Sequence, residues 1–299
     1  MTVNTNDWPA EQFENHRAHL RSVAYRMLGS LTEADDAVQE SWLRLSRADT
    51  GDVRDLRAWL TTVVSRVCLD MLRSRASRRE QSLEAEADAH VPDPIVTRID
   101  DAPEEHAVLA DSIGIALLVV LDTLSPTERL AFVLHDVFAM PFEQIGSILD
   151  RSPAAAKQLA SRARRRLRDA PPHPTDLARQ WTVVDAFLAA SREGDFEGLL
   201  TILDPDVVLR ADAGAGPFGP SGVTRGAREV IANARRFAPL GRFARPVLVN
   251  GGPGFLVVRD GSPLALMAIT VRDGKIVEMD VLSDTARLAS LDLAEVIDG

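Results

Sequence analysis

The chain is poor in the residues that would place it in several large classes of protein. Cys68 is the single cysteine among 299 residues, so no internal disulfide can form, and a reducing cytosol suits the protein. Cys68 lies in an apolar run between Val67 and Leu69, and we expect it to be a small buried side chain rather than a reactive thiol. Aromatic residues make up only 5%, which favours small helical modules packed from Leu, Val and Ala.

Membrane segments and export signals are missing as well. No apolar run approaches the roughly 20 residues that a helix needs to cross a bilayer. Residues 1–10 lack the basic and apolar blocks of a signal peptide. We therefore expect a cytoplasmic protein that does not bind a membrane.

An excess of positive charge is also absent, because the formal net charge is −10. A protein that binds DNA on its own usually carries net positive charge, since neutralisation of phosphates supplies most of its affinity. The global charge therefore argues against strong autonomous DNA binding. Locally the distribution differs, because arginines cluster over residues 73–79 and again over 162–168.

Hydrophobic periodicity divides the chain into three folded segments. Helical spacing predicts helices over 10–28, over 33–46 with Thr32 as the cap, and from Asp55 to 76. Between 77 and 103 acids and prolines replace this pattern, which predicts a linker that is extended around Pro92-Asp93-Pro94. Helical spacing returns and includes a helix over 104–124, until the prolines at 171–174 end it. We predict all-α domains at 1–76 and 104–170, an acidic linker at 77–103, and a third domain at 171–299.

The third domain has a different pattern. A long helix ending at Gly194 and a short one after it precede strand-like runs at 207–209, 245–250, 255–259, 264–271 and 276–282. A helix over 227–237 interrupts the strands. Gly251-Gly252, Asp260-Gly261 and Asp273-Gly274 predict hairpin turns. Helices followed by mostly antiparallel strands predict an α+β fold.

The strongest functional signal lies in residues 126–168. Ser125 to Glu128 form a capping box that starts a helix to about 138; a short helix to 149, a tight turn and a helix capped by Ser152 follow. These are the proportions of a helix-turn-helix, whose second helix enters the major groove. A solvated basic face is the alternative, but the spacing of caps and turn favours DNA. The residues expected at the DNA surface are Ser152, Ala155, Lys157, Gln158, Ser161, Arg162 and Arg165.

The helix over 33–45 carries an acidic strip. This strip cannot bind DNA and suits a basic protein partner, although an ordinary solvated face explains it equally well. The next helix is basic toward its C-terminal half. The residues of the acidic strip are Asp35, Asp36, Gln39, Glu40 and, on the same side, Leu43.

Several strings within 10–168 resemble extracytoplasmic-function sigma factors. Residues 25–29 (Tyr-Arg-Met-Leu-Gly), 33–44 (Glu-Ala-Asp-Asp-Ala-Val-Gln-Glu-Ser-Trp-Leu-Arg), 59–60 (Trp-Leu) and 70–73 (Asp-Met-Leu-Arg) resemble their region 2. Residues 124–129 (Leu-Ser-Pro-Thr-Glu-Arg), 142–146 (Phe-Glu-Gln-Ile-Gly) and 152–158 (Ser-Pro-Ala-Ala-Ala-Lys-Gln) resemble their region 4. Found together in this order, these motifs are highly specific.

The resemblance implies partners and roles. The acidic strip would dock on the β′ clamp helices of the RNA polymerase core, and region 4 would meet its β flap. Loop 46–55 and helix 56–75 would melt and read the −10 element of promoter DNA, holding a flipped base in a polar pocket, and helix 153–168 would read the −35 element. Many relatives have asparagine where Arg66 stands. The −10 residues implied are Arg54, Arg66, Asp70, Arg73 and Arg75.

The third domain resembles the SnoaL-like cone-shaped barrel, an α+β fold that follows the sigma regions in factors of the SigJ type. Residues 90–95 (His-Val-Pro-Asp-Pro-Ile) resemble the linker motif of that group, 212–216 loosely match its glycine-rich loop, and 283–288 faintly echo its last motif. The resemblance implies that this domain tunes activity within the chain and replaces a separate anti-sigma factor. The residues implied in this regulation are Pro92, Asp93, Pro94, Asp212 and Asp284.

Catalysis by the third domain is disfavoured. Residues 175–299 contain no His, Cys or Tyr, which leaves Asp212, Glu278 and Asp280 as candidate bases. By strand alternation Glu278 and Asp280 share one face, which suits polar or interface residues. We therefore expect neither enzymatic activity nor a cofactor. We also expect no metal site, because His16, His19, His106 and His135 do not have the spacing of metal ligands. The hypothesis that this domain has a cavity that senses a small molecule remains. The rival hypothesis for the whole chain is a helix-turn-helix regulator fused to a ligand-binding or enzymatic domain.

Overall fold

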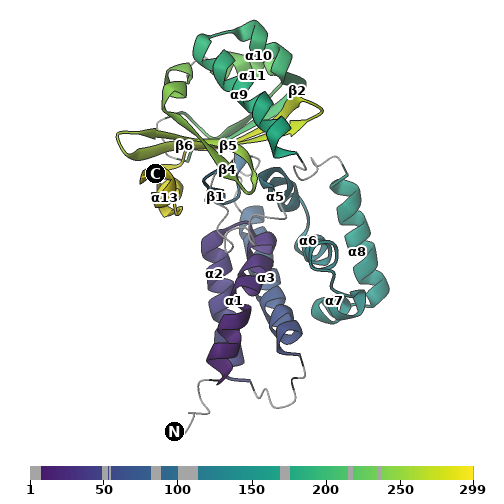
Figure 1. Cartoon of the computed structure of the whole chain (residues 1–299). Coiled ribbons are helices and arrows are strands. Elements are labelled where there is room, and N and C mark those ends of the chain that lie inside the picture. Colours follow the sequence, from purple (N-terminus) through teal and green to yellow (C-terminus); the bar gives the residue numbers. More distant parts are fainter. Residues whose placement is uncertain are drawn as a thin grey trace. The chain divides into compact units, whose positions relative to one another are not determined.

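The computed structural model describes residues 8–48, 53, 55–81, 89–99, 114–168, 176–214, 218–234 and 237–298. The chain divides into two compact units (Figure 1), one made of residues 1–83 and 120–169 and the other of 84–119 and 170–299. The first unit is helical and holds most of both predicted all-α domains. The second is α+β. Among the residues described, no helix is long and apolar enough to cross a membrane.

Three helices begin the first unit: α1 (Trp8–Leu28), α2 (Leu31–Leu45) and α3 (Leu56–Gln81). Gly29 ends α1 in the left-handed conformation, with φ of +70°. The cap of α2 is Ser30 and not Thr32, because Ser30 is the residue with extended backbone and its Oγ accepts from Glu33 N at 3.4 Å. Cys68 is buried in α3, as predicted, and burial raises the pKa of its thiol.

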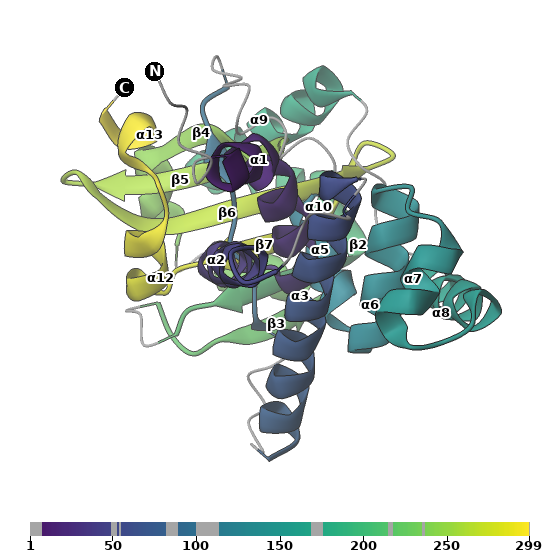
Figure 2. The ribbon, with the colours of Figure 1, turned by 90° about the horizontal axis from the view of Figure 1, so that it is seen from below.

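The helix-turn-helix region has the predicted order. It consists of α5 (Ile115–Asp122), α6 (Pro126–Phe132), a π-helical turn η2 (Val133–Val137), α7 (Phe142–Leu149) and α8 (Pro153–Arg166). Figure 2 shows α6, α7 and α8 grouped together. The capping box of Ser125 and Glu128 is present, and the predicted helix over 104–124 is described only from Ile115 onward.

The turn between α7 and α8 is tight for two reasons. Asp150 adopts φ of +53°, and Ser152 Oγ caps α8 by accepting from Ala155 N at 3.2 Å. A Cβ at Gly146 would lie 2.7 Å from the Arg151 carbonyl oxygen. Glycine is therefore required where α7 meets the turn.

The second unit is a sheet with helices α9 (Leu177–Glu193), α10 (Phe196–Ile202) and α11 (Ala227–Ala234) on one face (Figure 1). Its seven described strands have the order β1-β4-β5-β6-β7-β2-β3, with β2 and β7 parallel and all other pairs antiparallel. Within the described residues the sheet stays open at β1 and β3, so it has the α+β architecture predicted but is not a closed barrel. The strands are β1 (Val96–Thr97), β2 (Leu203–Asp212), β3 (Gly222–Arg225), β4 (Ala244–Val249), β5 (Gly252–Arg259), β6 (Ser262–Arg272) and β7 (Lys275–Leu282), and a 3-10 turn η3 (Ala238–Phe243) and helices α12 (Thr285–Ser290) and α13 (Ala294–Asp298) complete the unit.

Two of the three hairpin turns are where the sequence predicts them. Asp260-Gly261 and Asp273-Gly274 have positive φ at both positions. The third turn is Asn250-Gly251, one residue earlier than predicted, with φ of 49° and 75°. Asparagine tolerates the left-handed conformation, and the fully buried Asn250 side chain also accepts from Ile95 N at 2.9 Å.

The described part of the segment predicted as a linker, residues 89–99, has no regular secondary structure around Pro92, but it also contributes a strand to the sheet. Val96 pairs with Val249 and Thr97 with Leu248, so β1 forms the edge beside β4. Val91 and Ile95 are buried. These few apolar residues anchor residues 89–97 on the second unit, although the surrounding sequence is acidic.

Candidate nucleic-acid interface and linker latch

Helix α8 presents one continuous polar face to solvent. Its buried residues, Ala156, Leu159, Ala160 and Ala163, recur at helical spacing and face α6 and α7. The opposite face carries the predicted DNA residues: Lys157, Gln158, Ser161, Arg162 and Arg165 are exposed, Ala155 is half-buried, and Ser152 is exposed at the cap. Among the described residues none of the Lys157, Gln158, Arg162 and Arg165 side chains has an ion-pair or hydrogen-bond partner, so their polar ends are available.

Two other arginines of α8 are already engaged. Arg164 Nε lies 2.7 Å from Asp136 Oδ1, and Arg166 Nη1 lies 2.9 Å from Glu128 Oε2. Because the Glu128 side chain is 6% exposed and also holds the α6 cap, Arg166 fastens the C-terminal part of α8 to α6. These two side chains frame the exposed face and do not extend it.

Four of the five predicted −10 residues lie on α3, and they differ in exposure and in hydrogen bonding. Asp70 and Arg73 are exposed and 3.6 Å apart. Arg66 is exposed, but its Nη2 donates to the Ser147 carbonyl at 3.2 Å. Arg75 is half-buried and donates to the Leu28 carbonyl at 3.1 Å and to the Glu33 carboxylate. Arg54 lies outside the described residues, as do residues 49–52 of the loop before α3.

The acidic strip on α2 is exposed as predicted. Asp35, Asp36 and Gln39 face solvent, and Leu43 on the same side is 39% exposed. Asp35 pairs with Arg21 of α1 at 2.7 Å, and Glu40 pairs with Arg44 along the helix at 3.0 Å. An exposed leucine among carboxylates suits a protein partner better than nucleic acid.

Sequence reasoning missed a buried arginine that joins the two helical regions of the first unit. Arg129 of α6 is 1% exposed; its Nη1 pairs with Asp122, and its Nε and Nη2 donate to the Arg26 carbonyl of α1 at 3.4 and 3.3 Å. Burial lowers the pKa of this guanidinium, and Asp122 opposes the shift. The Arg66–Ser147 bond spans the same two regions. The first unit is therefore held together by polar contacts as well as apolar ones.

A second cluster, the linker latch, is formed by Arg287, Asp212, Asp93 and Val91. Arg287 of α12 donates to Asp212 Oδ2 at 2.5 Å, to Asp93 Oδ1 at 2.6 Å and to the Val91 carbonyl at 2.6 Å. Val91 N donates to Asp212 Oδ2 at 3.0 Å, and His90 Nδ1 lies 3.2 Å from the same oxygen. Burial alone would raise the pKa of Asp212, but the hydrogen bonds from His90 and Val91 and the charge of Arg287 bring it below its ordinary value.

The latch contains two of the predicted regulatory residues, Asp93 and Asp212, and the other three lie next to it. Asp284 caps α12, which carries Arg287, by accepting from Ala286 N and Arg287 N. A Cβ at Gly214 would overlap Asp284 Oδ2, so Gly214 approaches this cap closely. Pro92 and Pro94 flank Asp93 and are buried. Arg287 itself was missed, although it stands inside the weak motif 283–288.

Glu278 and Asp280 share one face of β7, as the alternation predicts. Both are buried, and Arg210 of β2 pairs with both carboxylates, at 2.9 Å for Asp280. Burial and the neighbouring Glu278 raise the pKa of Asp280 to about 7, and Arg210 opposes the shift. Their neighbours Met279 and Val281 face the opposite side of the sheet and line a cavity that none of the candidate bases reaches. No group of metal-ligating side chains occurs among the described residues.

Known proteins resemble the chain over nearly its whole length. Residues 12–78 match Sigma-70 region 2, and residues 115–167 match Sigma-70, region 4. The ECF RNA polymerase sigma factor SigJ of Mycobacterium tuberculosis is 41% identical over 287 residues, covering 89% of this chain and 88% of that protein. The probable ECF RNA polymerase sigma factor SigI of the same species is 34% identical over 97% of this chain and 98% of its own length. The crystal structure of SigJ superposes with a TM-score of 0.76 and 35% identity, over 95% of this chain and 99% of that one.

Proposed function

The chain belongs to the extracytoplasmic-function RNA polymerase sigma factors and directs promoter-specific transcription initiation, and from this premise we propose how its parts divide the work. The outward face of α8 reads the −35 element. Helix α3 and the loop before it melt and read the −10 element. The second unit regulates both from within the chain, so that no separate anti-sigma factor is needed.

The observation that carries this assignment is the exposed face of α8 with Lys157, Gln158, Arg162 and Arg165, whose side chains have no partner within the residues that the structure describes. Its N-terminal half combines small residues with Lys157 and Gln158, so the helix can approach base edges closely while these side chains, and Arg162 one turn further on, reach them. Arg165, one turn further on, is placed to neutralise a phosphate. The net charge of −10 makes this contact insufficient alone, which fits a factor that binds promoters as part of the polymerase.

The polymerase contact is proposed for the acidic strip of α2. Asp36, Gln39 and Leu43 leave a polar and apolar surface that a basic helical partner can cover. The β′ clamp helices of the core enzyme are the partner implied by family resemblance, with the β flap as the partner of region 4.

Run-off transcription with core polymerase tests the −35 assignment. Arg162→Ala should weaken promoter binding by about 1–3 kcal/mol if Arg162 makes a bidentate base contact. Arg179→Ala is the control, since it removes an arginine whose side chain is 89% exposed on the second unit. Equal promoter affinity of the two variants would refute the role of Arg162. A gel shift without polymerase distinguishes this proposal from the rival hypothesis of a helix-turn-helix regulator, because such a regulator would bind its operator DNA without polymerase.

Regulation within the chain is proposed for the linker latch. The latch fixes residues 90–93, which lead toward α5 and the helix-turn-helix, on the second unit. We expect Arg287→Ala to change the transcript yield at least twofold at a fixed ratio of factor to core enzyme. An unchanged yield would contradict regulation through the latch.

The second unit is proposed to act without catalysis. Asp212 is engaged in the latch, and Glu278 and Asp280 are paired with Arg210. No candidate base therefore meets the cavity of this unit, where a substrate would have to bind.

A further inference from the structure

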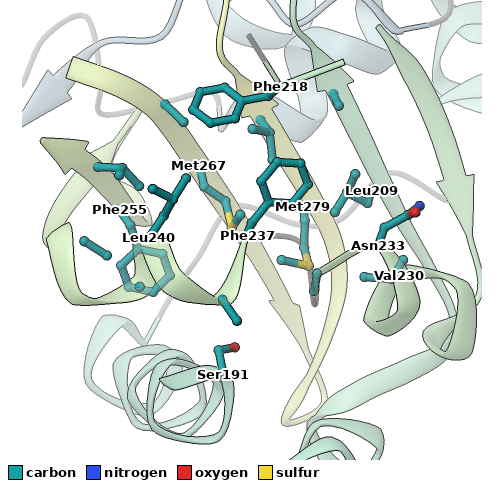
Figure 3. A pocket seen from close by; sticks show the side chains of 18 of the residues that line it. Ser191, Leu209, Phe218, Val230, Asn233, Phe237, Leu240, Phe255, Met267 and Met279 are labelled. Carbon is teal, nitrogen blue, oxygen red and sulfur yellow. The ribbon is translucent and has the colours of Figure 1, made fainter. Parts of the chain in front are cut away.

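The second unit contains a cavity of about 190 Å³ between its helices and its sheet (Figure 3). Five of the ten phenylalanines of the chain line it, together with Met267 and Met279. Phe218 and Phe237 meet edge to face at a centroid distance of 5.8 Å, and Phe237 is 38% exposed, so this pair lies where the cavity meets solvent. An aromatic pair at an opening can admit a flat apolar molecule by side-chain rotation alone.

The chemistry of the wall selects the occupant. No described lining residue is ionisable, so the cavity offers nothing to balance the charge of an ionic ligand. Its polar groups are few, chiefly Ser191, Asn233 and Ser283. Ser191 Oγ points into the cavity (Figure 3), is buried and has no hydrogen-bond partner among the described residues. A buried hydroxyl without a partner is unusual in a native protein, and a ligand atom is one way to satisfy it.

The size is that of a small ring compound. An engineered apolar cavity of about 150 Å³ holds benzene, so this cavity has room for a slightly larger molecule. Water would be poorly held here, because an ordered water needs two to four polar partners. We propose that the cavity binds a neutral compound of one or two fused rings with a single hydroxyl or carbonyl group that bonds to Ser191.

The cavity wall adjoins the linker latch. Ala213 and Ser283 line the cavity, and their chain neighbours Asp212 and Asp284 hold the latch and the α12 cap. Ser283 N donates to the Asp212 carbonyl at 2.8 Å, so a shift of either wall residue is passed to Asp212. The occupant therefore changes the grip of Arg287 on the linker. This second step rests on the proposed regulatory function, whereas binding does not.

Calorimetry on the full chain tests the binding. The probe is 2-naphthol, a neutral two-ring alcohol, and 2-naphthoate is its anionic counterpart. We expect 2-naphthol to bind and 2-naphthoate to bind at least tenfold more weakly. Equal affinity for both, or no binding of 2-naphthol up to its solubility, would overturn the proposed site.

Two variants locate the site. Ala265→Leu on β6 fills the cavity and should weaken 2-naphthol at least tenfold, whereas Ala232→Leu, on the exposed side of α11, should not. Ser191→Ala should weaken 2-naphthol about fivefold and leave naphthalene, which lacks the hydroxyl, unchanged. Thermal unfolding verifies that each variant is folded. Binding that survives Ala265→Leu would place the ligand elsewhere and refute the proposal.

Run-off transcription tests the coupling separately. We expect 2-naphthol to change transcript yield with the unmodified chain and to have no effect with Ala265→Leu. Binding without any change in yield would remove the coupling and keep the site. If Arg287→Ala also left the yield unchanged, the proposed regulation through the latch would fail as well, independently of the cavity.

Discussion

Replacing Arg287 should release the linker from the second unit. The guanidinium makes three contacts of 2.5 to 2.6 Å, to two carboxylates and one carbonyl, and the side chains of Arg287, Asp93 and Asp212 are 23%, 18% and 13% exposed. A hydrogen bond to a charged group contributes about 1.5–3 kcal/mol, and three bonds sharing one side chain do not add. We therefore expect Arg287→Ala to weaken docking of residues 90–95 by about 3 kcal/mol, roughly 150-fold.

Amide hydrogen exchange measures this docking directly. Val91 N donates to Asp212 and Ile95 N donates to Asn250, so both amides should exchange faster in the variant by up to that factor. Asp93→Asn removes one charged partner and should accelerate exchange by only about tenfold, and the double variant should be less than additive because the two side chains share a contact. Amides of β5 and β6 serve as internal controls and should not change. Acceleration of Val91 and Ile95 below twofold would refute the energetic role assigned to the latch.

Three further predictions concern stability. Burial lowers the pKa of His19 to about 4, so the folded protein keeps this ring neutral. Its contribution to stability should be complete above pH 6.5 and fall by about 3 kcal/mol toward pH 4. The variant His19→Gln should flatten that slope in urea titrations at successive pH values. The raised pKa of Asp280, about 7, gives the opposite pH dependence: the contribution of this carboxyl to stability falls as the pH rises from 4 through 7. In thermal unfolding, Asp280→Asn should therefore be more stable than the parent at pH 8 but not at pH 4. Parallel pH profiles of the two proteins would contradict this. In urea unfolding, Arg129→Met should destabilise the first unit by about 3 kcal/mol, because it removes the donor to Asp122 and to the buried Arg26 carbonyl. As a control, Arg164→Ala removes an exposed ion pair and should change stability by less than about 0.5 kcal/mol. Similar losses in both variants would refute the structural role of Arg129.

Local signals account for what the sequence could predict. The caps at Ser125 and Ser152 and the helical spacing between them fix the helix-turn-helix, and the same spacing identifies the exposed face of α8. The longer strands follow from their alternation and from the Asp-Gly turns. Strands β1 and β3 were missed, because two and four residues are too short to show a period.

Contacts between distant residues could not be predicted in the same way. Arg166 and Arg162 look alike in the sequence, yet within the described part of the chain only Arg166 has a partner, Glu128, 38 residues away. The contact of Arg287 with Asp93 spans 194 residues, and neither side chain carries a local sign of it. The cavity could not be predicted from the sequence either, because its lining residues are spread between Phe187 and Ser283 and each has the pattern of an ordinary core residue.

The pairing of β1 with β4 has a consequence for aggregation. A sheet edge with free N–H and C=O groups is a template for any extended peptide, and native proteins blunt such edges with proline or a covering strand. Here Pro246 blocks part of β4, and in the described part of the linker β1 pairs with Leu248 and Val249 while Ile95 bonds to Asn250. If the linker leaves the sheet, the backbone N–H and C=O groups of Leu248 and Val249 become available for pairing with a strand of another chain. A state in which the linker is released would therefore be prone to pair with other extended strands through this edge.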